Sequence, residues 1–310
     1  MPFLDDVLAG LDADPPQLAP KYFYDAVGSR LFDRITELDA YYPTRTERGI
    51  LRDHVGEIVG AIGPNAVLIE YGSGSSEKTR ILLDALAERA PLAAYVPVDI
   101  SAEHLATTAA DLRRAYPDLA VLPVAADYSR PIPLPGLPAH ARRVVFFPGS
   151  TIGNSDPAEA TAFLGRMADA AGPDGALLVG ADQRKDPAVL VRAYDDPEGV
   201  TAAFNRNVLR RIRDELGADL DLDGWAHQAR WNDAHGRIEM HLVADGPQTI
   251  ALGDHAFAFA DGDSIWTESS YKYAPDGLAA LARDAGLDRA ARWTDGRGWF
   301  AVEMFTPRGS

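Results

Sequence analysis

The feature that most constrains the fold is an alternation of short apolar runs with alanine-rich stretches between residues 65 and 182. In the alanine-rich stretches apolar residues recur every three or four positions, as in helices, whereas the apolar runs have the length of strands. The runs are AVLIEYG, AAYVPVD, LAVLPVAAD, RRVVFFPGS and GALLVGAD. This alternation is typical of right-handed βαβ units, so it predicts an α/β fold with a parallel sheet covered on both faces. Ligands of such sheets bind at the carboxyl ends of the strands.

The chain outside this region predicts a second domain. Residues 191–216 have a helical pattern, and residues 230–273 have the pattern of antiparallel strands joined by Gly and Asp turns. The last residues, from 277 on, predict one helix and a hairpin that rejoin the parallel sheet. We therefore predict a sheet domain of residues 46–194 and 274–310, and a discontinuous α+β domain of residues 1–45 and 195–273 that binds substrate.

The composition of the chain limits the kinds of molecule that the protein is expected to bind. The formal net charge of −16 repels polyanions, so we expect no nucleic acid partner. Without cysteine the chain has no thiolate metal site and no thiol nucleophile, and its seven histidines show no metal-ligand spacing, so we predict no metal. No stretch approaches the length of a membrane span, and aspartates stand near the N-terminus where a signal peptide would carry Lys or Arg. We expect a cytoplasmic protein, a monomer, with no membrane partner.

The turn after the first apolar run, EYGSGSSEKT, resembles two phosphate-binding loops and departs from both at one residue. Residues 72–79 match the template G-x-x-x-x-G-K-[ST] except that Glu77 replaces the second glycine. Glu77 also replaces the third glycine of the dinucleotide template G-x-G-x-x-G. A carboxylate at that position would repel a phosphate, and its Cβ would prevent close approach of the backbone. The sequence therefore argues against a P-loop kinase or ATPase.

S-adenosylmethionine suits this turn better, because it carries a cationic sulfonium and no phosphate. The segment from Glu70 to Gly74 resembles the acidic-x-Gly-x-Gly turn of Rossmann-type methyltransferases. Asp99, which ends the second run, is predicted to accept hydrogen bonds from the ribose hydroxyls, and Asp127, which ends the third, to face the adenine amine. The alternative interpretation is that both aspartates are helix N-caps and do not contact a cofactor. The predicted cofactor-binding residues are Glu70, Gly72, Ser73, Gly74, Lys78, Asp99, Asp127 and Tyr128.

Motifs along nearly the whole chain carry a more specific resemblance. They are KYFYDAVGSRLFDRITELDAYYPTRTE, EYGSGSSEKTR, FFPGSTIGN, VRAYDDPEGVTAAFNRNVL, RIEMHLV and WTESSYKY. In this order they resemble the histidine Nα-methyltransferases of ergothioneine biosynthesis. The resemblance implies a Rossmann-like class I methyltransferase core and a separate domain that completes the amino acid pocket. It also implies trimethylation of the α-amine of L-histidine to hercynine, with the mono- and dimethyl intermediates as further substrates and S-adenosylmethionine as co-substrate.

The resemblance also assigns the substrate-binding residues. It places Asn154 and Tyr194 at the substrate carboxylate, with Gly149 as a further contact. Tyr24 and Tyr41 are its catalytic residues beside the amine, where aromatic faces tolerate the final quaternary ammonium, and Tyr41 also reaches the carboxylate. Glu268 and Ser270 hold the two imidazole nitrogens, and Met240 lies beneath the ring. Without the resemblance, these are a helix-capping Asn, half-buried tyrosines, an exposed strand carboxylate and a core Met.

The segment WTESSYKY bears on the choice of substrate. Side chains alternate along a strand, so Glu268 and Ser270 are predicted on one face, and Thr267, Ser269 and Tyr271 on the other. A carboxylate beside a hydroxyl favours histidine over another aromatic amino acid. Methylation of tryptophan or tyrosine by the same family is the alternative function, and a binding protein of the same fold without activity is a further hypothesis.

Overall fold

The computed structural model describes residues 2–74, 76–128, 130–138 and 140–309, and it does not describe the side chain of Glu77. The prediction that rested on that side chain therefore lies outside the described part. The chain divides into two compact units. The antiparallel-sheet unit contains residues 1–42 and 185–272, and the parallel-sheet unit contains residues 43–184 and 273–310.

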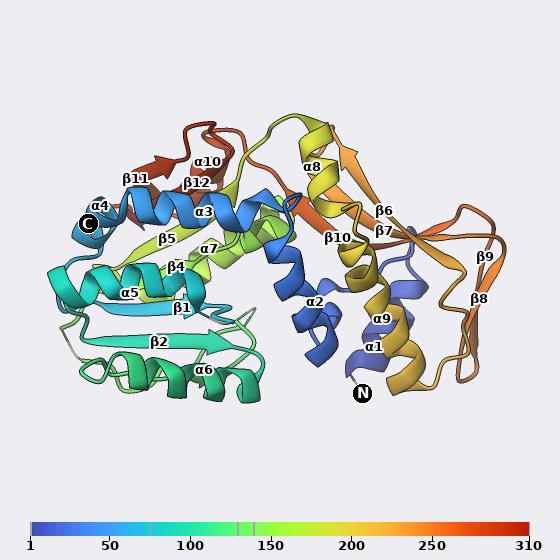
Figure 1. Ribbon diagram of the computed structural model, residues 1–310, viewed down its shortest axis with the longest axis horizontal. Helices are drawn as coiled ribbons and strands as arrows, with labels where there is room; N and C mark the ends of the chain where they lie inside the picture. Colours follow the sequence, from blue (N-terminus) through green and yellow to red (C-terminus); the bar gives the residue numbers. More distant parts are fainter. Residues whose placement is uncertain (1, 75, 129, 139, 310) are drawn as a thin grey trace. The chain divides into compact units, whose positions relative to one another are not determined.

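The parallel-sheet unit has a seven-stranded sheet in the order β11-β12-β5-β4-β1-β2-β3 (Figure 1). Its strands are β1 (Val67–Tyr71), β2 (Ala94–Asp99), β3 (Val124–Ala125), β4 (Arg143–Phe147), β5 (Ala176–Asp182), β11 (Leu287–Thr294) and β12 (Phe300–Pro307). The first five are parallel, whereas β12 runs antiparallel to β5 and β11 antiparallel to β12. The strand order reverses between β1 and β4, which is where sheets of this kind bind ligands.

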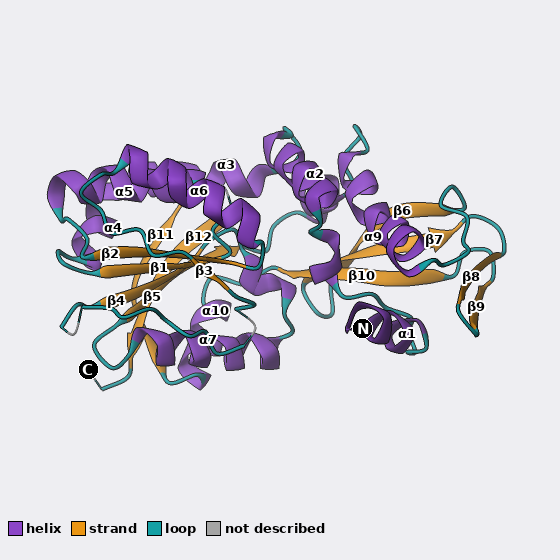
Figure 2. Ribbon diagram, turned by 90° about the horizontal axis from the view of Figure 1, so that it is seen from below, coloured by secondary structure: helices purple, strands orange, loops and turns teal. Residues whose placement is uncertain are grey.

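Helices cover both faces of this sheet. They are α3 (Tyr42–Asp53), α4 (Val55–Ile62), α5 (Glu77–Arg89), α6 (Ala102–Ala115), α7 (Pro157–Ala171) and α10 (Gly277–Asp284), with the 3₁₀ helix η2 (Thr151–Asn154). Figure 2 shows α3, α4, α5 and α6 on one face and α7 with α10 on the other. Strands β1 and β5 are buried along their whole length, which is why their sequences are mostly apolar runs rather than alternating, with Glu70 and Asp182 as the charged exceptions. The predicted α/β class and the return of the last helix and hairpin to the sheet are confirmed.

The third strand is much shorter than the sequence predicts. The run LAVLPVAAD forms a single bridge from Val121 to Tyr95 and then only the two residues of β3. Pro123 lies between these two pairings and has no backbone N–H to donate to a neighbouring strand. Asp127 therefore lies two residues beyond the strand instead of ending it.

The antiparallel-sheet unit contains two sheets. Its strands are β6 (Trp225–Asn232), β7 (Arg237–Ala244), β8 (Gln248–Leu252), β9 (His255–Phe259) and β10 (Ser264–Tyr271), and they form one sheet in the order β10-β7-β6 and a second from β8 and β9. Its helices are α1 (Pro2–Leu11), η1 (Pro20–Phe23), α2 (Ala26–Glu37), α8 (Pro187–Tyr194) and α9 (Val200–Leu216). Helix α9 packs on β6 and β7 and against α2, and the segment after α1 pairs with β10 through the bridge from Gln17 to Trp266. The predicted antiparallel strands are thus present.

The boundary between the units lies earlier than the sequence predicts. The prediction placed residues up to 194 with the parallel sheet, whereas Lys185 already begins the second segment of the antiparallel-sheet unit. Helix α8 packs on β6 and β7 through its buried residues Leu190, Ala193 and Tyr194. This apolar face assigns the helix to the unit that covers it. The other boundaries lie within three residues of the predicted ones, at 42 and 272.

Among the described helices none has the length and apolarity needed to cross a membrane.

Candidate active site

The loop that follows β1 has a backbone that requires its glycines. Gly72 and Gly74 have φ values of 69° and 46°, in the left-handed region that other residues avoid. The N–H groups of Gly72 and Ser73 both donate to the carbonyl of Val98 in β2, at 2.9 and 3.1 Å. The side chain of Ser73 is buried, and its Oγ has no hydrogen-bond partner within the described part of the chain. A buried hydroxyl without a partner in a glycine loop marks a place for a polar ligand group.

Two predicted cofactor residues close the loop from the side of β2. Asp99 accepts from the N–H of Gly74 at 3.0 Å and from the N–H of Ser101 at 3.0 Å, so it joins the ends of β1 and β2. The ring of Tyr128 lies over Gly72, where an added Cβ would be 3.6 Å from it. Burial raises the pKa of Tyr128 to about 12, and the charges of Asp99 and Asp127 raise it further. The structure thus brings Gly72, Asp99, Asp127 and Tyr128 together.

Glu70 lies beneath the loop and holds it to the sheet. Its carboxylate accepts hydrogen bonds from Thr79 Oγ1 at 2.6 Å and from the hydroxyl of Tyr95. Burial raises the pKa of Glu70 to about 7, although these two bonds act in the opposite direction. Glu70 therefore positions the loop from below, and its direct contact with a cofactor stays a prediction.

We predict that replacing Glu70 with Gln weakens the pH dependence of stability. The folded pKa of about 7 is above the ordinary value of 4.5, so the folded state binds this proton more tightly than the unfolded state. The protonated Glu70 therefore stabilises the folded state relative to the ionised one. This stabilisation is fully present below pH 4.5 and is lost as the pH rises through 7. Since one pKa unit corresponds to about 1.4 kcal/mol, the wild type should lose roughly 3 kcal/mol more than Glu70→Gln across this window.

Denaturant unfolding at several pH values between 4.5 and 7.5 measures this difference. The exposed Glu88 of α5 provides the matched control, because Glu88→Gln should keep the wild-type slope. Parallel curves for the wild type and Glu70→Gln would show that Glu70 does not titrate in this range.

Lys78, a predicted cofactor residue, forms an ion pair with a buried carboxylate that the sequence did not reveal. Its Nζ donates to Glu47 Oε2 at 2.7 Å, and the Glu47 side chain is fully buried. The same carboxylate accepts from the N–H of Gly149 at 2.9 and 3.0 Å. A Cβ on Gly180 would lie 2.2 Å from Glu47 Oε1, so the glycine in β5 leaves the space that the carboxylate occupies. Glu47 thus joins α3, α5 and the turn that follows β4.

Asn154, a predicted substrate-binding residue, is the last residue of η2 and is half-buried.

Aromatic rings form a continuous series in the antiparallel-sheet unit. Tyr24 contacts Phe32 and Phe204, with ring centroids 5.7 and 5.6 Å apart. Phe32 contacts Tyr41 at 6.4 Å, and Tyr41 contacts Tyr194 at 5.9 Å. The two predicted catalytic tyrosines therefore belong to one aromatic surface that ends at Tyr194. Such a surface can accept a cationic ammonium group.

The predicted imidazole-binding residues Glu268, Ser270 and Met240 share one face of the three-stranded sheet, which is called the pocket face because the substrate pocket is predicted there. Glu268 pairs with Met240 of the neighbouring strand, and Ser270 pairs with Ile238 two residues further along. Glu268, Ser270 and Met240 are all buried. Tyr194 of α8 lies against this face, with its hydroxyl 2.8 Å from Ser270 Oγ. Burial raises the pKa of Glu268 to about 7, and the positive charge of Lys272 acts to lower it.

One part of the predicted alternation in β10 is wrong. The pairing with β7 shifts between Trp266 and Glu268, so Thr267 is an additional residue in a β-bulge. Its hydroxyl donates to Asn205 Oδ1 of α9 at 2.7 Å. Because of the bulge, the side chain of Thr267 points toward α9. The alternation predicts it on the face opposite to Glu268.

The sequence analysis did not single out Lys272, which lies beside the residues of the pocket face. The lysine is buried, and its Nζ donates to the Tyr194 hydroxyl at 2.8 Å and to Ser270 Oγ at 2.9 Å. A signal was available, because the alternation that places Glu268 and Ser270 on one face places Lys272 there too. The buried pocket face thus carries a cation as well as a carboxylate.

His227 holds the end of α8 beside this face. Its Nε2 donates to the carbonyl of Tyr194 at 2.8 Å, and its Nδ1 then accepts from Asn205 Nδ2 at 2.8 Å. Burial lowers the pKa of His227, which favours this neutral form. The side chain of His227 is packed in the interior, whereas His104 of α6 is exposed.

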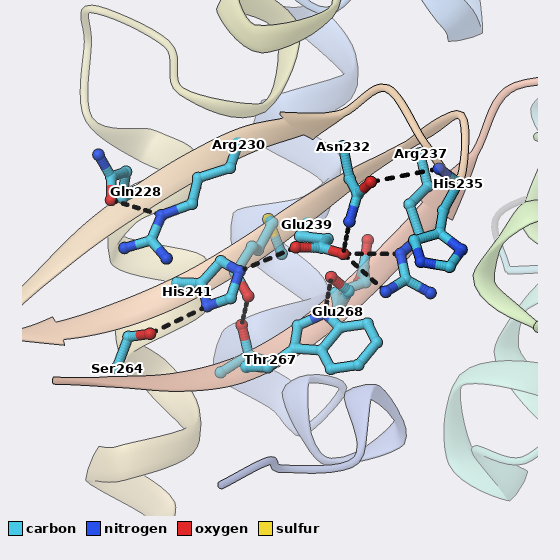
Figure 3. Close-up of polar contacts among 12 residues, drawn as sticks. Gln228, Arg230, Asn232, His235, Arg237, Glu239, His241, Ser264, Thr267 and Glu268 are labelled. Atoms are coloured by element: carbon cyan, nitrogen blue, oxygen red, sulfur yellow. Dashed lines mark hydrogen bonds and ion pairs between the residues drawn. The ribbon is translucent and has the colours of Figure 1, made fainter. Parts of the chain in front are cut away.

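The opposite face of the same strands carries a separate polar network (Figure 3). Glu239 accepts from Arg237 Nε at 2.8 Å and from Asn232 Nδ2 at 2.9 Å, and the guanidinium of Arg237 lies 4.4 Å from the centre of the Trp266 ring. Because Glu239 and Met240 are neighbours in β7, their side chains point to opposite faces. This network is therefore not part of the pocket face. Across the described residues, no group of three or more His, Asp or Glu side chains could hold a metal ion.

The predicted site residues fall into two sets. The antiparallel-sheet unit holds Tyr24, Tyr41, Tyr194, Met240, Glu268 and Ser270, and the parallel-sheet unit holds Glu70, Gly72, Ser73, Gly74, Lys78, Asp99, Asp127, Tyr128, Gly149 and Asn154. The first set combines an aromatic surface with a buried carboxylate and hydroxyl. The second includes the glycine loop at the point where the strand order reverses.

Comparison with known proteins decides which family these features represent. The family described as "Histidine-specific methyltransferase, SAM-dependent" matches residues 3–307. The chain belongs to this family. The resemblance derived from the motifs is thereby confirmed, and with it the assignment to the S-adenosylmethionine-dependent methyltransferases.

Curated relatives agree with the family match. The chain is 47% identical to a histidine N-alpha-methyltransferase of Mycobacterium tuberculosis, in an alignment that covers 96% of this chain and 93% of the relative. It is 46% identical, with the same coverage, to a histidine N-alpha-methyltransferase of Mycolicibacterium smegmatis. It is 31% identical to ergothioneine biosynthesis protein 1 of Neurospora crassa, where 91% of this chain aligns with 32% of a much longer protein.

Proposed function

We propose that this methyltransferase transfers three methyl groups in succession from S-adenosylmethionine to the α-amine of L-histidine, and that its product, hercynine, enters ergothioneine biosynthesis. The observation that carries the proposal is the buried pair of Glu268 and Ser270 beside Met240, in a chain 47% identical to a histidine N-alpha-methyltransferase. Support for the pathway comes from the similarity to ergothioneine biosynthesis protein 1.

The parallel-sheet unit would hold S-adenosylmethionine, which supplies an electrophilic methyl group. The positive φ values of Gly72 and Gly74 let the backbone approach the methionine end, and the buried Ser73 Oγ has no other partner in the described chain. Asp99 can accept from the ribose hydroxyls, because a carboxylate can take more than the two bonds it already accepts here. Asp127 and Tyr128 are proposed for the adenine, and Asn154 and Gly149 for contacts to the amino acid.

The antiparallel-sheet unit would hold the imidazole and the amine. Glu268 accepts from a ring N–H, and the hydroxyl of Ser270 serves the other ring nitrogen. Methyl transfer needs a neutral amine held about 3–3.5 Å from the methyl carbon, so positioning is the main requirement. Tyr24 and Tyr41 offer aromatic faces that remain favourable when the amine has become a quaternary ammonium. A fixed hydrogen-bond acceptor would lose its partner at that stage.

A mass-spectrometric assay with S-adenosylmethionine and a panel of amino acids tests the proposal. We expect histidine to gain three methyl groups, and Nα-methyl and Nα,Nα-dimethylhistidine to be converted to the same product. Tryptophan or tyrosine as the methylated amino acid would replace the histidine assignment with the alternative one. Tight binding of both ligands without turnover would refute enzymatic activity.

A further inference from the structure

Three buried polar side chains beside the pocket face form a network of hydrogen bonds that the proposed reaction does not use. They are Thr267 of β10, Asn205 of α9 and His227 of β6, and we call them the Asn205 network. Thr267 is 1% exposed, Asn205 is 0% exposed, and the side chain of His227 is 1% exposed. Burying a polar side chain costs free energy unless its hydrogen bonds are made, and an apolar residue of similar shape avoids this cost. Packing alone therefore does not account for these residues.

The backbone carbonyl of His241 fixes the orientation of the Asn205 amide. A carbonyl can only accept, so the amide turns its Nδ2 toward it, at 3.1 Å. The second hydrogen of Nδ2 faces His227 Nδ1 at 2.8 Å, so Nδ1 accepts and the ring carries its proton on Nε2. This Nε2 donates to the carbonyl of Tyr194 at 2.8 Å. On the other side, Asn205 Oδ1 accepts from the hydroxyl of Thr267 at 2.7 Å. The bonds of the network thus have defined directions.

Both ends of the Asn205 network lie next to predicted substrate-binding residues. Thr267 is the additional residue of the β-bulge, and Glu268 follows it directly. At the other end, His227 holds the carbonyl of Tyr194, the last residue of α8, whose hydroxyl is 2.8 Å from Ser270 Oγ. A bulge redirects the side chains of its strand, so its position affects where Glu268 points. The network therefore ties the bulge in β10 to the end of α8 through α9.

We propose that the Asn205 network sets the distance between Glu268 and the Tyr194–Ser270 hydroxyl pair, and thereby fits the pocket face to histidine. Its three members are positioning residues, because they act through the backbone of β10 and of the end of α8. Hydrogen bonds of defined direction restrict the spacing of two elements more narrowly than apolar contacts do. This inference rests on the proposed function, in which histidine is the substrate.

Two substitutions of Thr267 separate the hydrogen bond from packing. Thr267→Val keeps the branched shape and removes the hydroxyl, whereas Thr267→Ser keeps the hydroxyl and removes a buried methyl group. Thr267→Val should raise the KM for histidine about tenfold, with a smaller change in kcat and no change in the KM for S-adenosylmethionine. Thr267→Ser should recover most of the wild-type KM, although its thermal midpoint should fall because a buried methyl group is lost.

The same substitution at an exposed strand position provides the matched control. Thr249 of β8 is exposed, so Thr249→Val should have wild-type kinetics and stability. If Thr267→Ser raises the KM for histidine as much as Thr267→Val does, the proposal is overturned, because KM then follows packing and not the hydrogen bond. Equal increases in the KM values for histidine and S-adenosylmethionine would overturn it too.

The tautomer of His227 provides a second readout, which needs neither substrate nor activity. In wild-type protein labelled with ¹⁵N-histidine, NMR at pH 7.5 should show the His227 proton on Nε2 and none on Nδ1. His227→Gln identifies its signals among those of the seven histidines. In Asn205→Asp an acceptor replaces the donor opposite Nδ1, so Nδ1 should become protonated. A protonated Nδ1 in the wild type, or an unchanged His227 in Asn205→Asp, would refute the network. The expected tautomer in a wild type that does not methylate histidine would instead refute the proposed function.

Discussion

Replacing Glu268 with Ala should reduce kcat/KM for histidine by about 10³-fold and leave the affinity for S-adenosylmethionine almost unchanged. Glu268 is buried on the pocket face, and it is the carboxylate that would accept the imidazole N–H. A site that is built to hydrogen-bond a substrate group loses much of its binding energy when one partner is removed. The methyl donor is proposed to bind the loop after β1, which belongs to a different compact unit.

Steady-state kinetics with histidine and calorimetric titration with S-adenosylmethionine measure the two effects separately. Glu215→Ala is a suitable control, because Glu215 forms an exposed ion pair with Arg211 and should affect neither quantity. The Glu268 variant should also discriminate less between histidine and phenylalanine. Equal losses of histidine activity and donor affinity would mean that Glu268 supports the fold and not substrate choice.

The fold could be predicted where local sequence alone determines the element. Runs such as VLIEY in β1 are buried on both faces, so apolar residues follow one another without alternation and only Glu70 is charged, which makes the strand unambiguous. The prediction was wrong where one residue interrupts a pattern. Pro123 divides the third strand, and the apolar face of α8 is covered by β6 and β7, which come later in the chain. An apolar face in the sequence does not identify the element that covers it.

The same distinction applies to the candidate site. The period of two in WTESSYKY places Glu268 and Ser270 on one face, and one more step would have included Lys272. The bulge at Thr267 depends on how β10 pairs with β7, so the sequence of β10 alone does not reveal it. Glu47 gave no signal, because its partners Lys78 and Gly149 are 31 and 102 residues away in the chain.

Replacing Glu47 with Ala should destabilise the protein by about 3–5 kcal/mol. The substitution removes a fully buried carboxylate and leaves the ammonium of Lys78 and the N–H of Gly149 without it. It also opens a space next to Gly180, which has no side chain to fill it. Thermal unfolding should show a midpoint lowered by roughly 10 °C. The cost comes from the Lys78 ammonium, which is only partly exposed and loses its carboxylate, together with the N–H of Gly149 and the space that Glu47 filled.

A double variant separates the remaining charge from the lost packing. If the unpaired ammonium is the main cost, Glu47→Ala combined with Lys78→Met should be more stable than Glu47→Ala alone. Glu88→Ala, on the exposed side of α5, should unfold like the wild type. A double variant that is less stable than Glu47→Ala would show that Lys78 finds another partner when Glu47 is absent. In that case Lys78 would stabilise the start of α5 independently of the ion pair, and the cost of Glu47→Ala would come from lost packing and from the N–H of Gly149.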